Sequence, residues 1–157
     1  MRHLQLLSRY NALFNRQLHA VLAAQGGGLD DAVVVQLNHI YVMDRIWLDR
    51  LTVADDCARF EAAMDAICFP QLEPWWTARR QLDREIELFV ASATALEDEV
   101  EFVTRADNIR VRCRMDDALA HLFNHQSLHR GEILHILNRN MVPFGNADLL
   151  PLIVRAD

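Results

Sequence analysis

Two histidines, His125 and His129, lie four residues apart in a stretch whose apolar residues recur at intervals of three and four. In a helix this spacing places both imidazoles on one side, about one turn apart, where they can share one small ligand. His39 shares a face of a second predicted helix with four apolar residues, so we expect it to point inward: Val35, Val42, Met43 and Ile46. Neutral imidazoles bind zinc, nickel and iron. The three histidines therefore predict a facial site for a divalent metal.

The competing interpretation is that these histidines are hydrogen-bonded core residues, because histidine pairs four residues apart also arise by chance. Two further histidines of the same stretch are weaker candidates. His121 lies one turn before His125 but drifts to the polar boundary of the predicted helix, so we treat it as a group that could orient a ligand. His135 lies further round, and we interpret it as structural.

The stretch from His125 to His129 departs from the zinc-protease pattern H-E-x-x-H, because Gln126 stands where that pattern has its catalytic glutamate. Zinc proteolysis is therefore disfavoured, and no side chain is identified as the catalytic group. The reacting group would be a metal-bound water or a thiol. Both need an open coordination position, which a site of three histidines leaves.

The apolar periodicity predicts the elements that carry these residues. Four helices are expected, over residues 2–24, 30–51, 74–95 and 116–140, with Asp30 as an N-cap, Pro74 in a first turn and Asp116 or Asp117 opening the last helix.

Two non-helical segments complete the prediction. Residues 52–74 form a long connection, which lets the helices that it joins pack in parallel, although Phe60, Met64 and Ile67 have short helical spacing within it. Alternating segments 100–104 and 109–113 predict a β-hairpin before the last helix. The expected fold is an all-α four-helix bundle with a long crossover connection and a small β-hairpin.

The length and the net charge of the chain limit the classes of protein to which it can belong. A chain of 157 residues with 52% hydrophobic content can bury a full core, so we expect a single domain over residues 1–157. Sixteen basic against 22 acidic residues give a net charge of −6, which argues against nucleic-acid binding. The short basic run is interpreted as a solvated strand face: Arg105, Arg110, Arg112 and Arg114.

The cysteine content and the hydropathy of the chain indicate the cellular compartment in which we expect the protein. Cys57, Cys68 and Cys113 are odd in number and lack C-x-x-C spacing, so a disulfide framework is not expected. No apolar run approaches the roughly 20 residues that span a bilayer, and the first residues are already amphipathic. We therefore expect a cytoplasmic protein without a membrane partner.

Several segments carry a resemblance to a known family. Residues 124–132 read NHQSLHRGE, close to the pattern N-H-x-x-x-H-R-G-Q with Glu132 in place of Gln, and residues 10–15, 39–48 and 148–150 match as well. Over most of its length the chain thus resembles the DinB/YfiT-like superfamily of metal-dependent enzymes. The resemblance implies a four-helix bundle, a metal held by His39, His125 and His129, and assembly as a homodimer.

The activity that the resemblance implies is less specific, because similar members include thiol-dependent S-transferases, isomerases and hydrolase-like proteins. Our leading hypothesis is transfer of a low-molecular-weight thiol to an electrophilic or stress-generated small molecule, with zinc, nickel or iron as cofactor. The alternatives are metal-activated hydrolysis of a small amide or ester, and a non-catalytic protein for metal binding or dimerisation.

Two charged residues near the histidines have open roles. Glu132 either accepts a hydrogen bond that orients an imidazole or faces solvent. Arg130 projects into the apolar arc of the last helix, and we interpret it as a structural residue, with an ion pair to a carboxylate or a subunit contact as the alternatives.

Overall fold

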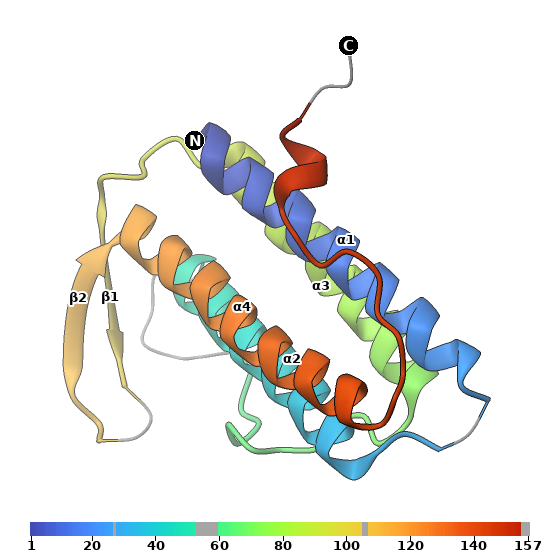
Figure 1. Cartoon of the computed structure of the whole chain (residues 1–157). Coiled ribbons are helices and arrows are strands. Elements are labelled where there is room, and N and C mark those ends of the chain that lie inside the picture. The colour runs from blue at the N-terminus through green and yellow to red at the C-terminus, as the bar shows by residue number, and fades with distance from the viewer. Residues whose placement is uncertain (27, 53–59, 105–106, 155–157) are drawn as a thin grey trace.

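The protein folds mainly into four helices and a two-stranded hairpin (Figure 1). The structure is a computed structural model that describes residues 1–26, 28–52, 60–104 and 107–154. Its elements are α1 (Arg2–Ala24), α2 (Asp31–Thr52), α3 (Leu72–Ser92), β1 (Glu99–Val103), β2 (Arg110–Arg114), α4 (Met115–Arg139) and the 3-10 helix η1 (Leu150–Leu152). The prediction of four helices with a hairpin before the last one is confirmed.

The ends of the helices follow from local hydrogen bonds and backbone angles. The Asp30 carboxylate accepts the Ala32 N–H at 2.9 Å, which is the predicted N-cap of α2. Helix α3 ends at Ser92 rather than at residue 95, because Ala93 turns to an extended conformation with ψ 120°. Helix α4 begins at Met115, immediately after the extended Arg114 that ends the hairpin.

The connection between α2 and α3 contains no helix within its described part, residues 60–71. The prediction of a long connection is confirmed for these residues, and the helical spacing of Phe60, Met64 and Ile67 produces no helix there. The Asn38 side chain of α2 holds the connection in place near its end, donating to the Phe69 carbonyl at 2.9 Å and accepting from the Phe69 N–H at 2.7 Å. Residues 53–59, which include Cys57, lie outside the described residues.

The order of the contacts between α2 and α3 gives the relative direction of these two helices. The Trp75 indole N–H donates to the Leu37 carbonyl at 3.0 Å; about one turn further along α3 and two turns further along α2, Arg79 pairs with Asp44 at 2.6 Å. These helices therefore run in parallel, as the long connection allows, whereas α1 packs antiparallel to α3 and α2 antiparallel to α4 (Figure 1).

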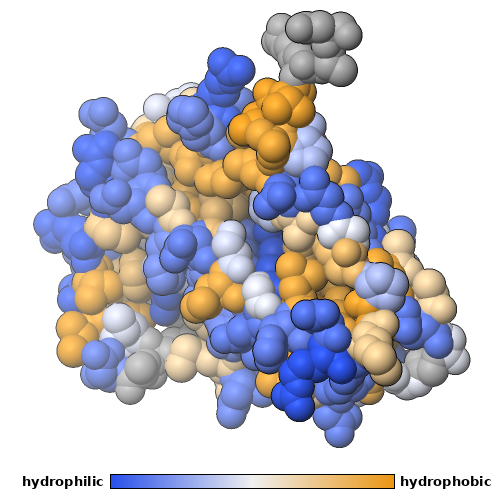
Figure 2. Space-filling model, viewed as in Figure 1, coloured by the Kyte–Doolittle hydropathy of each residue, from blue (hydrophilic) through white to orange (hydrophobic). Residues whose placement is uncertain are grey.

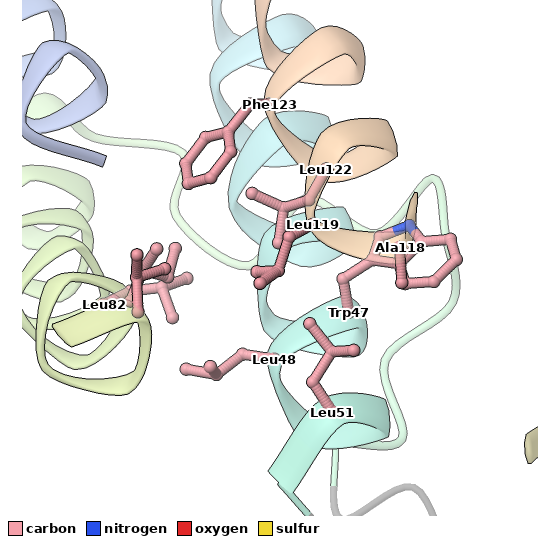
Figure 3. Close-up of a cluster of buried hydrophobic side chains, with 10 residues drawn as sticks. Trp47, Leu48, Leu51, Leu82, Ala118, Leu119, Leu122 and Phe123 are labelled. Carbon is pink, nitrogen blue, oxygen red and sulfur yellow. The ribbon is translucent and has the colours of Figure 1, made fainter. Parts of the chain in front are cut away.

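Two clusters of buried apolar side chains fill the space between the helices. The first joins α2, α3 and α4 at the hairpin end and includes Trp47, Leu48, Leu51, Leu82, Leu119, Leu122 and Phe123 (Figure 3). The second brings α1 together with the other three helices and includes Phe14, Leu18, Leu37, Trp75, Ile133 and Leu137. Full burial of such a side chain stabilises a fold by about 1.5–3 kcal/mol, so these clusters fix how α2 and α4 lie against each other.

The hairpin presents a charged outer face. Glu101 pairs with Arg110 and, at 2.9 Å, with Arg112, whose other contact is Glu99 at 3.3 Å. The basic run is thus an exposed, ion-paired strand face as predicted, with Arg105 outside the described residues.

An apolar stretch of the C-terminal segment is exposed (orange, near the top of Figure 2), formed by Leu150, Leu152, Ile153 and Val154. Among the described residues, Cys68 and Cys113 are both free thiols and both half-buried. Among the described helices, none has the length and apolarity to cross a bilayer.

Candidate metal centre

Three histidines from two helices converge at the outer edge of the α2–α4 contact. One ring nitrogen from each of His39, His125 and His129 lies within 4.8 Å of the other two. The His129 ring centroid is 4.4 Å from those of His39 and His125. All three side chains are half-buried, and Val35, on the same side of α2, is 50% exposed. Val42 and Ile46, on this side too, are at most 1% exposed, so His39 lies at the edge of the core and the expected inward direction holds in part.

Hydrogen bonds at Nδ1 orient two of the three rings. Nδ1 of His39 lies 3.1 Å from the Met64 carbonyl oxygen, and Nδ1 of His129 lies 2.9 Å from a Glu132 carboxylate oxygen and 3.0 Å from the Gln36 amide oxygen. Oxygens of this kind can only accept, so each Nδ1 carries a proton, and in a neutral imidazole of this tautomer Nε2 keeps its lone pair. This is the arrangement in which proteins present histidine to a metal.

His125 completes the group with a different environment. Its Nε2 lies 3.2 Å from Nε2 of His129, while its Nδ1 is buried and bonds to no described residue. Burial, followed by the charge that His129 and His39 would place beside it, lowers the pKa of His125 to about 4. His125 is therefore neutral at physiological pH, which is the form that binds metals.

The spacing of the nitrogens fits one tetrahedral ion. Three nitrogens bound at about 2.0–2.1 Å from such an ion lie roughly 3.4 Å apart. The 3.2 Å separation of the His125 and His129 Nε2 atoms agrees with this, and a ring nitrogen of His39 lies within 4.8 Å of a ring nitrogen of each. Three neutral imidazoles suit zinc, nickel or iron rather than calcium or magnesium, which prefer oxygen ligands.

Space for a small molecule adjoins the histidines. A cavity of about 540 Å³ is lined by His39, Ala63, Met64 and Asp65. Its wall is mostly apolar apart from the imidazole and the Asp65 carboxylate.

The two other candidate histidines do not join the cluster. His121 is exposed and packs against the Trp47 ring at 4.8 Å, with its own ring centroid 6.0 Å from that of His125. His135 is exposed on α4. Glu132, by contrast, lies where the sequence allowed it to orient an imidazole, and the alternative that it faces solvent alone is wrong.

Arg130 is enclosed by its own chain, with 3% of its surface exposed. Its guanidinium lies 4.8 Å from the Phe14 ring centroid and 5.4 Å from that of Tyr10, and it donates to the Gln126 amide oxygen at 3.4 Å. Within the described residues it forms no ion pair at 4.0 Å or less. This burial agrees with the structural interpretation of Arg130, and aromatic faces stabilise the cation in place of the alternative ion pair. Burial lowers the pKa of Arg130 to about 10, which leaves it charged at neutral pH.

Two contacts of the histidines were not predicted from the sequence. Gln36 precedes His39 by three residues and so lies on the same side of α2, a spacing that could have indicated it. The Met64 carbonyl could not have been found, since it is a backbone group of a connection whose path depends on tertiary contacts.

The model of the DinB protein family matches residues 6–141 of the chain. This span contains all three histidines and their contacts Gln36, Met64 and Glu132. No curated protein and no solved structure matches the chain.

Proposed function

Because the chain belongs to the DinB family, we propose that it is a metal-dependent enzyme of the DinB type, in which His39, His125 and His129 hold a divalent ion. The observation that carries the proposal is the orientation of the rings: hydrogen bonds at Nδ1 of His39 and His129 leave their Nε2 lone pairs available to one cation. We further propose that the four helices are the bundle of this family and form one domain.

The surrounding residues have separate tasks in this proposal. Glu132 and Gln36 hold the His129 ring in place, and the Met64 carbonyl holds that of His39. The cavity beside His39 admits a small molecule and brings it next to the imidazoles. A bound divalent ion would supply Lewis-acid chemistry, which lowers the pKa of a coordinated thiol or water.

We propose thiol transfer as the reaction. The Glu132 carboxylate is engaged at Nδ1 of His129, on the far side of the ring from Nε2, so it orients a ligand and is not placed as a base for water. A substrate that brings its own acidic group, such as a thiol, fits this arrangement. The sulfur forms a bond to an electrophilic carbon, the leaving group departs with its electron pair, and the thiol proton passes to solvent.

Hydrolysis of a small amide or ester is the second candidate. It is favoured by Asp65, whose carboxylate lines the cavity next to His39 and could accept a proton from water. A non-catalytic role in metal binding is the third reading, and it predicts bound metal without turnover.

An activity screen separates these reactions. The metal-loaded protein is incubated with a haloalkyl or bimane-type electrophile, with and without each of several low-molecular-weight thiols, and product is followed by mass spectrometry. Turnover that requires a thiol and is lost in His125→Ala supports transfer. Ester or amide cleavage without any thiol would contradict it and favour hydrolysis, in which case Asp65→Asn should lower the rate.

We also propose a cytoplasmic homodimer, on the strength of the family resemblance. Light scattering after size exclusion should give twice the mass of the 157-residue chain. A monomer at micromolar concentration would contradict the dimer without touching the metal site.

A further inference from the structure

A circuit of buried polar side chains runs through all four helices on the core side of α2. Each member is at most 3% exposed, and the members are Asn11 and Asn15 of α1, Asp44 of α2, Arg79 and Asp83 of α3, and Gln126 and Arg130 of α4. Two carboxylates and two guanidiniums give the circuit no net charge.

The circuit can be followed from helix to helix. Asn11 and Asn15 donate to the Asp83 carboxylate at 2.9 and 3.0 Å, and Asp83 pairs with Arg79 at 2.8 Å. Arg79 donates to Asp44 at 2.6 Å. The same Asp44 oxygen accepts the Gln126 amide at 2.7 Å, which carries the circuit to α4.

The Asp44–Gln126 hydrogen bond and the three histidines lie on opposite flanks of one helix–helix contact. Gln126 directly follows His125, and Asp44 follows His39 by five residues, about 7.5 Å along the helix axis. The bond thus joins α2 to α4 on the core flank close to where His39 meets His125 and His129 on the outer flank.

This bond also fixes how far α4 can slide along α2. A shift of either helix would take the Gln126 donor away from Asp44, whose charge is buried beside Arg79, and an unmatched buried charge or donor is costly. A buried polar pair therefore sets helix register more sharply than apolar packing, which tolerates small shifts.

We propose that Asp44 and Gln126 are positioning residues for the metal centre: their hydrogen bond sets the register of α2 against α4 and so brings His39 within reach of the ion that His125 and His129 share. This inference rests on the proposed metal site and deepens it, since it assigns a role to residues that touch neither metal nor substrate.

The test compares two variants that each remove one amide donor from a buried carboxylate. Gln126→Met keeps the side-chain length but loses the donor to Asp44. Asn15→Leu, the matched control, loses the donor to Asp83 between α1 and α3 and leaves the α2–α4 bond intact. Zinc affinity is measured by competition with a chromophoric chelator, and the visible absorption of the cobalt(II)-loaded protein reports the coordination geometry.

We expect Gln126→Met to bind zinc about tenfold more weakly, at the low end of effects from residues outside the ligand set, and to change the cobalt spectrum. Asn15→Leu should lower the unfolding midpoint without changing either quantity. Should Gln126→Met fail to fold, Gln126→Asn, which is one methylene too short to reach Asp44, makes the same break with a polar side chain.

Each outcome decides between the claims. Wild-type protein that binds zinc together with a folded Gln126 variant of unchanged affinity and spectrum would overturn this inference alone. Equal losses of affinity in Gln126→Met and Asn15→Leu would also overturn it, because they would trace to general stability. Wild-type protein that binds none of zinc, cobalt, nickel and iron(II) would overturn the inference and the proposed function together.

Discussion

The two flanks of the α2–α4 contact use polar residues in opposite ways. The core flank brings together unlike charges, with Arg79 paired to both Asp44 and Asp83 inside the chain. The outer flank brings together three like groups, the half-buried imidazoles of His39, His125 and His129. We propose that this group is completed by a cation. The comparison teaches that a polar cluster of opposite charges holds helices together, whereas a cluster of like ligand groups is a candidate for binding something from outside.

Breaking the core flank should have the largest effect on stability. Arg79→Met leaves Asp44 and Asp83 as buried carboxylates without their common partner. Removing one partner of a buried pair costs about 3–5 kcal/mol, so the free energy of unfolding from urea denaturation should fall by this amount.

The matched surface control is Arg112→Met on the hairpin, which loses ion pairs to Glu99 and Glu101. Exposed pairs of this kind contribute little in water, and its urea midpoint should stay at the wild-type value. Equal shifts in the two variants would contradict the distinction between buried and exposed pairs.

Arg130 sharpens the comparison within the core flank. Its guanidinium lies over the rings of Phe14 and Tyr10 instead of beside a carboxylate. Arg130→Met loses a desolvated cation–π contact, worth about 2 kcal/mol. It also removes the free-energy cost of burying a charge, the same burial that lowers the pKa of Arg130 to about 10. We expect Arg130→Met to lower the free energy of unfolding less than Arg79→Met does, in the same urea titration. A larger loss than in Arg79→Met would show that Arg130 neutralises the buried carboxylates of Asp44 and Asp83.

On the outer flank, Glu132→Gln should weaken metal binding and spare the fold. The amide still accepts the His129 Nδ1–H but lacks the negative charge that makes the imidazole a stronger ligand. Zinc affinity should fall about tenfold, as measured by chelator competition.

Glu73→Gln provides the control, because Glu73 contacts a different histidine, His19, at 2.9 Å and far from the centre in sequence. It should leave zinc affinity unchanged. A wild-type affinity in Glu132→Gln would mean that the carboxylate does not act on the metal through His129.

Local patterns predicted much of the fold. The apolar spacing of residues 2–24 indicated α1 with both its ends, and Asp30 indicated the start of α2, because periodicity and capping depend on near neighbours. The path of residues 60–71 could not be predicted, since it depends on Asn38 bonding to Phe69 across 31 positions.

The site was predictable in part for the same reason. Helical spacing put His125 and His129 together and indicated an inward His39, the family pattern agreed on all three, and the structure brings them together. Their role as ligands stays a prediction. The half-exposed setting of His39 was missed because α2 has apolar residues on most sides, and the partners of Asp44 and Arg79 were missed because pairing across helices depends on register, which one sequence does not specify.

The central claim is that the three histidines hold a metal ion, and metal content tests it most directly. Protein purified without a histidine tag and reconstituted with zinc, nickel or iron(II) is analysed by plasma mass spectrometry beside His125→Ala/His129→Ala. We predict about one ion per chain in the wild type and none in the double variant, which should keep its helical circular dichroism because both side chains are only half-buried. No bound ion in the wild type, or equal metal in both proteins, would contradict the account.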